Sequence, residues 1–200
     1  MTAIAWPSLT RSGPRNLDWS LVSNTVSFQS PLSGAVQTVE FPGARWKVSF
    51  LLENLVEADA ALFQAFLARL RGRAGRFTLH NFARPAPRGT IAGTVLVKGA
   101  GQTGTTLAID GCAAGATLLA GDFFAVAGEL KMVVADAVAD GAGEMSVTFE
   151  PPLRAAPADN APLTLDRPTA TFMLFGDEAK WTTQPGKFST FPIDAVECWT

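Results

Sequence analysis

One segment of the chain has the apolar spacing of a helix, and it lies between segments that alternate like β-strands. From Asn54 onward, apolar side chains recur every three or four residues and would gather on one face of a helix: Leu62, Phe63, Phe66, Leu67 and Leu70. Asn54 followed by Glu57 fits a capping box, and Gly72 suits the left-handed residue that ends many helices. The pattern predicts an amphipathic helix over about residues 56–71.

Most of the remaining chain shows the period-two alternation of β-strands. The clearest example is Ala35–Leu52, where Pro42-Gly43 supplies turn chemistry between two alternating runs, the second built on Trp46, Val48, Phe50 and Leu52. We therefore predict a hairpin that turns at Pro42-Gly43. A strand bent near Asn24 is expected over Leu17–Gln29, and a short strand over Arg76–Leu79. The apolar face of the helix is expected to cover this sheet.

Two proline-rich segments, residues 83–89 and 151–162, bracket a run of short strand candidates separated by glycines. The candidates are Thr90–Lys98, Thr105–Asp110, Asp122–Ala127, Leu130–Asp136 and Met145–Glu150. The apolar runs after residue 162 are too short to fold alone. We therefore predict a mainly β protein in which residues 1–88 and 163–200 form a β-sandwich with one packed α-helix. Residues 89–162 are predicted to form an inserted small β-barrel, OB-like or galectin-like.

Composition and charge indicate a protein that assembles. Charged residues make up 17% of the chain, against about 25% in typical soluble domains, so more of the surface is apolar or covered by neighbours. Residues 1–90 carry ten basic and five acidic side chains, a net +5, and residues 91–200 carry six and thirteen, a net −7. This division is either chance or a head-to-tail contact between copies. Residues 1–14 contain two prolines and no period, which predicts an irregular arm lying on a neighbour.

Residues able to carry catalysis or hold a metal are scarce. His80 is the only histidine, no nucleophile elbow is present, and two distant cysteines lack metal-ligand spacing. Gly99, Gly101 and Gly104 form a G-x-G-x-x-G, but a strand pattern follows where phosphate binding needs a helix, so we expect a hairpin loop. We predict a non-enzymatic protein without metal or cofactor. No window approaches the roughly 18 apolar residues of a membrane span, so no membrane insertion is expected.

The arginines at the helix exit are the most distinctive charged feature. Arg69, Arg71, Arg73 and Arg76 either serve the helix end and solvent, or bind acidic residues of a neighbouring subunit; contact with passing DNA phosphates is a third interpretation. Trp46, Trp181 and Trp199 lie on β segments, where an exposed tryptophan would suit an interface anchor. The candidate subunit-interface residues are therefore Trp46, Arg69, Arg71, Arg73 and Arg76.

The order and wording of the chain from about Ser30 to Leu165 resemble a known family. The segments that carry the resemblance are SPLSGAVQTVEFPGARWKVSFLLENL, FLARLRGRAGRFTLHNF and PRGTIAGTVLVKGAGQTGTTLAIDG. They are similar to the distal tail proteins of long-tailed, siphovirus-type phages and prophages. The resemblance implies a tail-tube-like fold with an extra β domain and a ring, usually a hexamer, that joins the tail tube to the tail tip or baseplate hub.

Further expectations follow from the same resemblance. The protein would be a structural component of the virion tail, assembled in the cytoplasm of the host bacterium, with tail-tube and hub proteins as partners and DNA only as cargo. Ala35–Leu52 would lie at the lumen or between subunits. The alternatives are another minor tail protein, a carbohydrate-binding β module that uses exposed tryptophans, and a glycan-cleaving tail enzyme that uses Asp110, Asp122 and Asp136.

Overall fold

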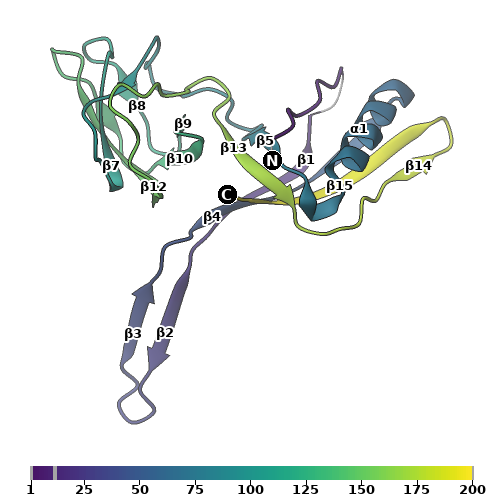
Figure 1. The fold of residues 1–200 in the computed structure, drawn as a ribbon, viewed down its shortest axis with the longest axis horizontal. Helices are drawn as coiled ribbons and strands as arrows, with labels where there is room; N and C mark the ends of the chain where they lie inside the picture. The colour runs from purple at the N-terminus through teal and green to yellow at the C-terminus, as the bar shows by residue number, and fades with distance from the viewer. Residues whose placement is uncertain (1, 11–12, 200) are drawn as a thin grey trace.

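The structure is mainly β and contains one α-helix among the residues it describes, 2–10 and 13–199 (Figure 1). In this computed structural model the strands form two groups. The first comprises β1 (Arg15–Val22), β2 (Thr25–Gln29), β3 (Val36–Glu40), β4 (Arg45–Leu55), α1 (Glu57–Leu70), the 3-10 helix η1 (Gly72–Ala74), β5 (Phe77–His80), β13 (Thr169–Leu174), β14 (Thr182–Gln184) and β15 (Phe188–Glu197). The second comprises β6 (Leu96–Val97), β7 (Gly104–Asp110), β8 (Thr117–Leu118), β9 (Phe123–Val126), β10 (Glu129–Val133), β11 (Ala137–Val138) and β12 (Met145–Leu153).

Strands from both ends of the chain share one six-stranded sheet. Its order is β1-β4-β15-β13-β5, with β14 paired to β15. The neighbours β5 and β13 pair directly, His80 opposite Thr169, although all strands of the second group lie between them in sequence. Helix α1 packs against this sheet, whereas the sequence predicted two sheets face to face (Figure 1). Among the described residues the apolar face of this sheet is covered by α1, by the N-terminal segment and, near Trp46, by Phe123 and Leu130 of the second group of strands, and no second sheet of the first group faces it.

The core of this first part confirms the alternation in β4. Trp46, Val48, Phe50 and Leu52 are all buried, as the period-two pattern predicts. The N-terminal segment adds Trp6, whose ring centroid lies 5.3 Å from that of Phe63 and 5.8 Å from that of Phe77. The described part of the segment therefore packs on its own chain, and its contact with a neighbour stays a prediction.

Helix α1 follows the predicted span with two differences. Its N-cap is Val56, without a side-chain cap, and Asn54 belongs to β4, so the predicted capping box is wrong. Leu62 is 56% exposed, whereas Phe63, Phe66, Leu67 and Leu70 are buried. At about 100° per residue, Leu62 lies well to one side of the centre of this face. Asp59 lies on the buried face, where it accepts hydrogen bonds from the backbone N and hydroxyl of Thr10.

The predicted hairpin at Pro42-Gly43 is also wrong. Strand β3 pairs with β2, Val26 opposite Val39, and β4 pairs with β1, Val22 opposite Arg45. The turn lies instead at Ser30–Ala35, where Gly34 has the positive φ of 69° that favours glycine. Both sites offer turn residues, and the turn at Ser30–Ala35 lets all of β1 pair with β4. The strand bend predicted near Asn24 is confirmed between β1 and β2.

The second group of strands builds a small closed barrel with its own core. The sheet order is β6-β7-β12-β10-β9, and the segment 161–164 joins its two edges. Val97 in β6 donates to Ala161 O at 3.0 Å, and Ala125 in β9 donates to Thr164 O at 2.9 Å. Four of the five strand candidates lie where the alternation put them; of Thr90–Lys98, only the two residues of β6 form a strand.

Asp122 fastens the start of this barrel. Its side chain is 1% exposed and accepts backbone hydrogen bonds from Arg88, Gly89 and Leu119 at 2.9, 3.2 and 2.9 Å. Burial alone would raise the pKa of Asp122, but these hydrogen bonds and the Arg88 side chain together outweigh it, so the pKa is lowered. The carboxylate therefore holds the entering chain against the loop before β9.

Asp122→Asn is expected to lower the free energy of unfolding by about 2 to 3 kcal/mol near neutral pH, because its amide group turns a donor toward buried N–H groups. Since the folded pKa is lowered, the stability from Asp122 is present above the ordinary aspartate pKa and is lost as pH falls through the folded pKa. Chemical denaturation at neutral and acidic pH should show the two proteins converging in acid. Asp159→Asn, at an exposed aspartate that binds only the Gly99 backbone N and the neighbouring Asn160 side chain, is the control.

Candidate assembly surface

Strands β2 and β3 form a two-stranded ribbon that projects away from the rest of the molecule (Figure 1). Every residue of both strands is exposed, and neither strand pairs with any other strand among the described residues. An isolated two-stranded ribbon is marginally stable in water, and its open edges are free to pair. The ribbon therefore receives no stabilising pairing from another strand of the described chain.

The ribbon has one face that is largely apolar and one that is mainly polar. Residues directly opposite each other share a face, so Val26 and Val39 lie together with Phe28. The other face carries Thr25, Ser27, Gln29, Thr38, Glu40 and the single apolar Val36. Phe28 is 62% exposed, and Leu32 at the tip is 97% exposed. An exposed apolar face of this kind is typical of a surface that another protein chain covers.

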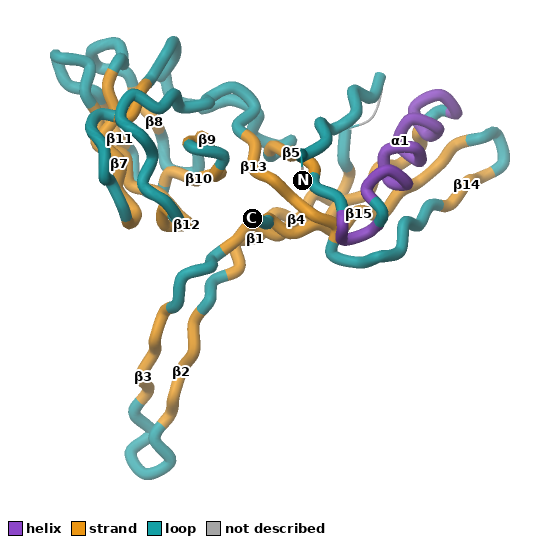
Figure 2. Tube along the Cα trace, viewed as in Figure 1, coloured by secondary structure: helices purple, strands orange, loops and turns teal. Residues whose placement is uncertain are grey.

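The ribbon continues β1 and β4 through an irregular base. Figure 2 shows loop segments interrupting both strands between the sheet and the ribbon. At this base Phe41 donates its backbone N–H to Asn24 O at 2.7 Å, and the Asn24 amide donates to Pro42 O at 2.9 Å. These bonds keep the two strands together where the regular pairing stops.

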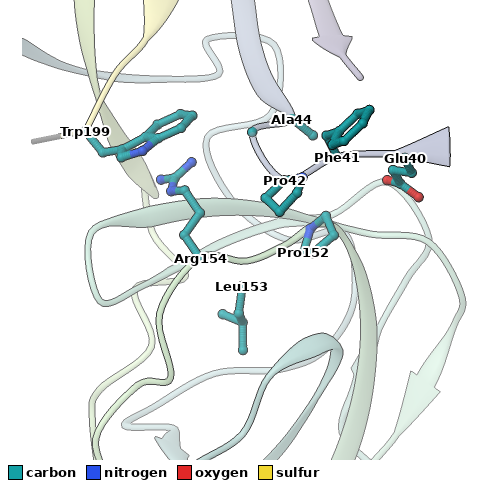
Figure 3. Close-up of a pocket in the computed structure, with 9 residues that line it drawn as sticks. Glu40, Phe41, Pro42, Ala44, Pro152, Leu153, Arg154 and Trp199 are labelled. Atoms are coloured by element: carbon teal, nitrogen blue, oxygen red, sulfur yellow. The ribbon is translucent and has the colours of Figure 1, made fainter. Parts of the chain in front are cut away.

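A cavity of about 640 Å³ lies beside the ribbon base, against the end of β12 (Figure 3). Phe41, Pro42, Leu153 and Trp199 give it a largely apolar wall. The Arg154 guanidinium lies 4.3 Å from the centroid of the Trp199 ring, a cation–π contact that holds the ring at the cavity edge. The apolar surface of the ribbon thus extends to its base.

The four arginines at the helix exit have different roles in the structure. Arg73 donates its Nε–H to Phe175 O at 2.8 Å and its backbone N–H to Asp177 Oδ1 at 3.1 Å. Arg76 Nη1 donates to three carbonyl oxygens of the loop before it, the shortest bond being to Arg73 O at 2.8 Å. Arg69 and Arg71 are exposed and form no ion pair within the described chain. The side chains of Arg69 and Arg71 thus differ from those of Arg73 and Arg76, which are held by carbonyl oxygens of the same chain.

Trp46 does not suit the interface role that the sequence suggested. It is 2% exposed, and its indole N–H donates to Leu130 O at 3.0 Å, a contact between the first sheet and the barrel. Its side chain is therefore inside the molecule. The exposed tryptophans are Trp181 and Trp199, at 42% and 46%.

The described residues do not gather the side chains of a metal site. No group of three or more His, Cys, Asp or Glu side chains in the part of the chain that the structure describes is placed to hold a metal ion. Burial, together with the nearby Arg167, lowers the pKa of His80. Cys112 and Cys198 are free thiols, and burial raises the pKa of both. The glycine-rich loop at 99–104 leads into strand β7, as the sequence predicts.

Neither the family models nor the curated proteins include a match to this chain. No helix in the described residues is long and apolar enough to span a membrane. The surfaces of the molecule are therefore the evidence for its function.

The sequence did not predict the pairing of β2 with β3 as a ribbon, although it placed Ala35–Leu52, which contains β3, at the lumen or between subunits. The signal was present in the alternation of Val26 and Phe28, and in the turn residues of Ser30–Ala35. This alternation predicts an ordinary strand, because nothing in the local sequence shows whether an alternating strand packs on a core or projects into solvent.

Proposed function

We propose that this protein is a structural component of a phage tail, a ring-forming adaptor that joins the tail tube to the tail tip or baseplate hub. The proposal combines the resemblance to distal tail proteins with a surface suited to assembly. Several copies would close a ring through their sheet edges and ribbons, with the six-stranded sheet tail-tube-like and the barrel an added β domain. Its role would be mechanical rather than catalytic.

The unsupported ribbon β2–β3 is the observation that carries this proposal. A monomer gains little from exposing Phe28 and Leu32 on a two-stranded ribbon, since exposed apolar surface costs free energy in water. In a ring, the ribbon of one copy would lie against its neighbour, and the open edges would find strands to pair with. The low fraction of charged residues fits a surface that neighbours cover.

The position of the tryptophans gives no support to a carbohydrate site on the barrel. All five tryptophans lie outside residues 89–162, so the barrel has no tryptophan platform for a sugar ring. Two of the three aspartates suggested for a glycan-cleaving enzyme bind backbone N–H groups: Asp122 as described, and Asp136 at 2.7 Å from Ala120 N. We therefore advance no second function.

Ring formation can be tested on the purified full chain. Mass measurement at rising concentration, with electron microscopy of negatively stained particles, should detect closed rings of uniform copy number, alone or on a tail-tube protein from the same genome. A chain that stays monomeric at every concentration, and that also fails to bind both the tail-tube and hub proteins, would contradict the proposal.

A further inference from the structure

A basic socket lies at the C-terminal end of helix α1. Arg69, Arg71 and Arg76 line a cavity of about 400 Å³, which we call the arginine socket, together with Thr2 and Ile4 of the N-terminal segment and Gly75. Three arginine residues thus border one cavity, and no carboxylate lines it.

The local backbone explains why these arginines meet. Arg71 ends the helix in the left-handed conformation, with φ of 52°, which turns the chain back on itself. At Gly75 a Cβ atom would meet Leu70 O at 2.5 Å, so only glycine allows the returning chain to pass so close to the helix end. Arg76 follows directly and therefore lies beside Arg69 and Arg71. The turn therefore brings three arginine residues to the border of one cavity.

Within the described chain these charges have no negative partner. Arg76 donates to loop carbonyl oxygens, and Arg69 and Arg71 form no ion pair. The carbonyl groups at the helix end carry only a partial negative charge. An anionic group in the socket would balance this positive charge, and planar guanidinium groups such as those of Arg69 and Arg71 bind carboxylates in paired hydrogen bonds.

The charge distribution of the chain indicates which anion this is. Residues 91–200 carry a net −7, and several of their carboxylates, such as Asp166, Glu178 and Asp194, are exposed and form no ion pair in the described chain. The whole chain is net negative, so its overall field repels nucleic acid while its two halves attract each other between copies. We infer that the arginine socket receives an acidic side chain from the C-terminal half of a second copy. This inference rests on the proposed ring and names one of its contacts.

Charge reversal at the socket is the first test. Arg69→Glu with Arg71→Glu is expected to weaken self-assembly of the full chain about tenfold or more, because each lost charged hydrogen bond is replaced by repulsion. The matched control is Arg167→Glu with Lys180→Glu, which changes net charge equally at exposed residues without ion pairs in the described chain. The control should assemble normally, and thermal unfolding should show that both double variants fold.

Cross-linking is the second test, and it identifies the partner residue. Arg71→Lys keeps the charge and introduces an amine that carbodiimide joins to a carboxylate in direct contact. In a mixture of heavy-isotope and ordinary protein, mass spectrometry should find the introduced lysine joined to an Asp or Glu of residues 91–200 on the other copy. Arg167→Lys serves as the matched control for random cross-linking.

The outcomes separate this inference from the proposed ring. Normal assembly of the socket double variant, without a cross-link between copies at the introduced lysine, overturns the socket and leaves ring formation standing. Failure of the wild-type chain to assemble, both alone and with the tail-tube and hub proteins, overturns both. If the double variant assembles normally but loses binding to a labelled DNA duplex, the socket serves phosphate and the inference is wrong.

Discussion

Replacing residues 23–44 with the dipeptide Asn-Gly is expected to abolish ring assembly while the rest of the chain keeps its fold. Val22 and Arg45 are opposite each other in the β1–β4 pairing, so a two-residue turn can close the shortened hairpin directly. The deletion removes β2, β3 and the tip, none of which has a residue in the buried core. The cooperative thermal transition should therefore remain, and size measurement should find only monomers.

A finer version of this experiment separates the apolar face from the open strand edges. Val26→Thr with Phe28→Thr keeps the backbone of the ribbon and removes apolar surface from one face. Each side chain contributes about 1.5 to 3 kcal/mol if a neighbour buries it fully, so we expect the association constant to fall by at least about tenfold. The control is Ser27→Val, which changes only the opposite face. If the double variant assembles as well as the wild type and the Ser27→Val control, the apolar face is not covered by a neighbour.

The sequence predicted elements whose evidence is local. The helix and the buried face of β4 follow from spacing alone, because a side chain's direction is set by the period of its own element. Barrel strands such as β7 and β9 were found for the same reason, since glycines and turn residues separate them. Leu62 shows the limit of this reasoning: an apolar residue at the margin of the stripe can face solvent.

Strand pairing could not be predicted, because it depends on contacts far apart in sequence. Pro42-Gly43 and Ser30–Ala35 are equally acceptable turns, and only the pairing of β1 with β4 decides between them. The side chains of Arg69 and Arg71 form no ion pair in the described chain, whereas Arg73 donates to the carbonyl oxygen of Phe175. This difference depends on where β13 ends, because Phe175 follows that strand directly. Alternation did offer one unused signal: Glu129 and Lys131, two residues apart in a strand, must share a face.

Glu129→Gln is expected to destabilise the protein by about 3 to 5 kcal/mol, the usual cost of leaving one member of a buried ion pair alone. Lys131 is 0% exposed, and its Nζ lies 2.6 Å from Glu129 Oε2 and 2.8 Å from Pro152 O. A neutral amide cannot balance the lysine charge. Urea denaturation near neutral pH measures the loss.

The converse variant should cost less, because Glu129 keeps other partners. Its carboxylate also accepts from the backbone N of Arg154 at 3.1 Å and of Ala155 at 3.3 Å. Lys131→Met is therefore expected to be milder than Glu129→Gln, and the double variant should recover part of the loss. A Glu129→Gln protein as stable as wild type would show that the pair contributes nothing.

The pH dependence gives an independent check on the same pair. Burial lowers the pKa of Lys131 below the ordinary 10.5, despite the opposing effect of Glu129. Between the folded and unfolded pKa values the unfolded chain binds more protons, so the free energy of unfolding rises with pH in that window. Without Glu129 the folded pKa falls further and the window widens downward. Glu129→Gln should therefore gain more stability on raising the pH than wild type does, and Lys131→Met should lose this rise.

This ion pair also belongs to the contact that orients the barrel on the sheet. Arg154 in the chain leaving β12 lies 3.6 Å from Glu129 and donates to Glu197 of β15 at 2.9 Å, and Glu197 in turn accepts from the backbone N of Trp46 at 3.1 Å. These charged side chains thus connect the barrel to the six-stranded sheet, the part of the molecule that is proposed to form the ring. Since buried charges must be paired in one geometry, they favour a single orientation of the barrel. Glu129→Gln should therefore also broaden the position of the barrel in images of assembled rings, whereas Asp159→Asn, at an exposed aspartate that binds the Gly99 backbone N, should not.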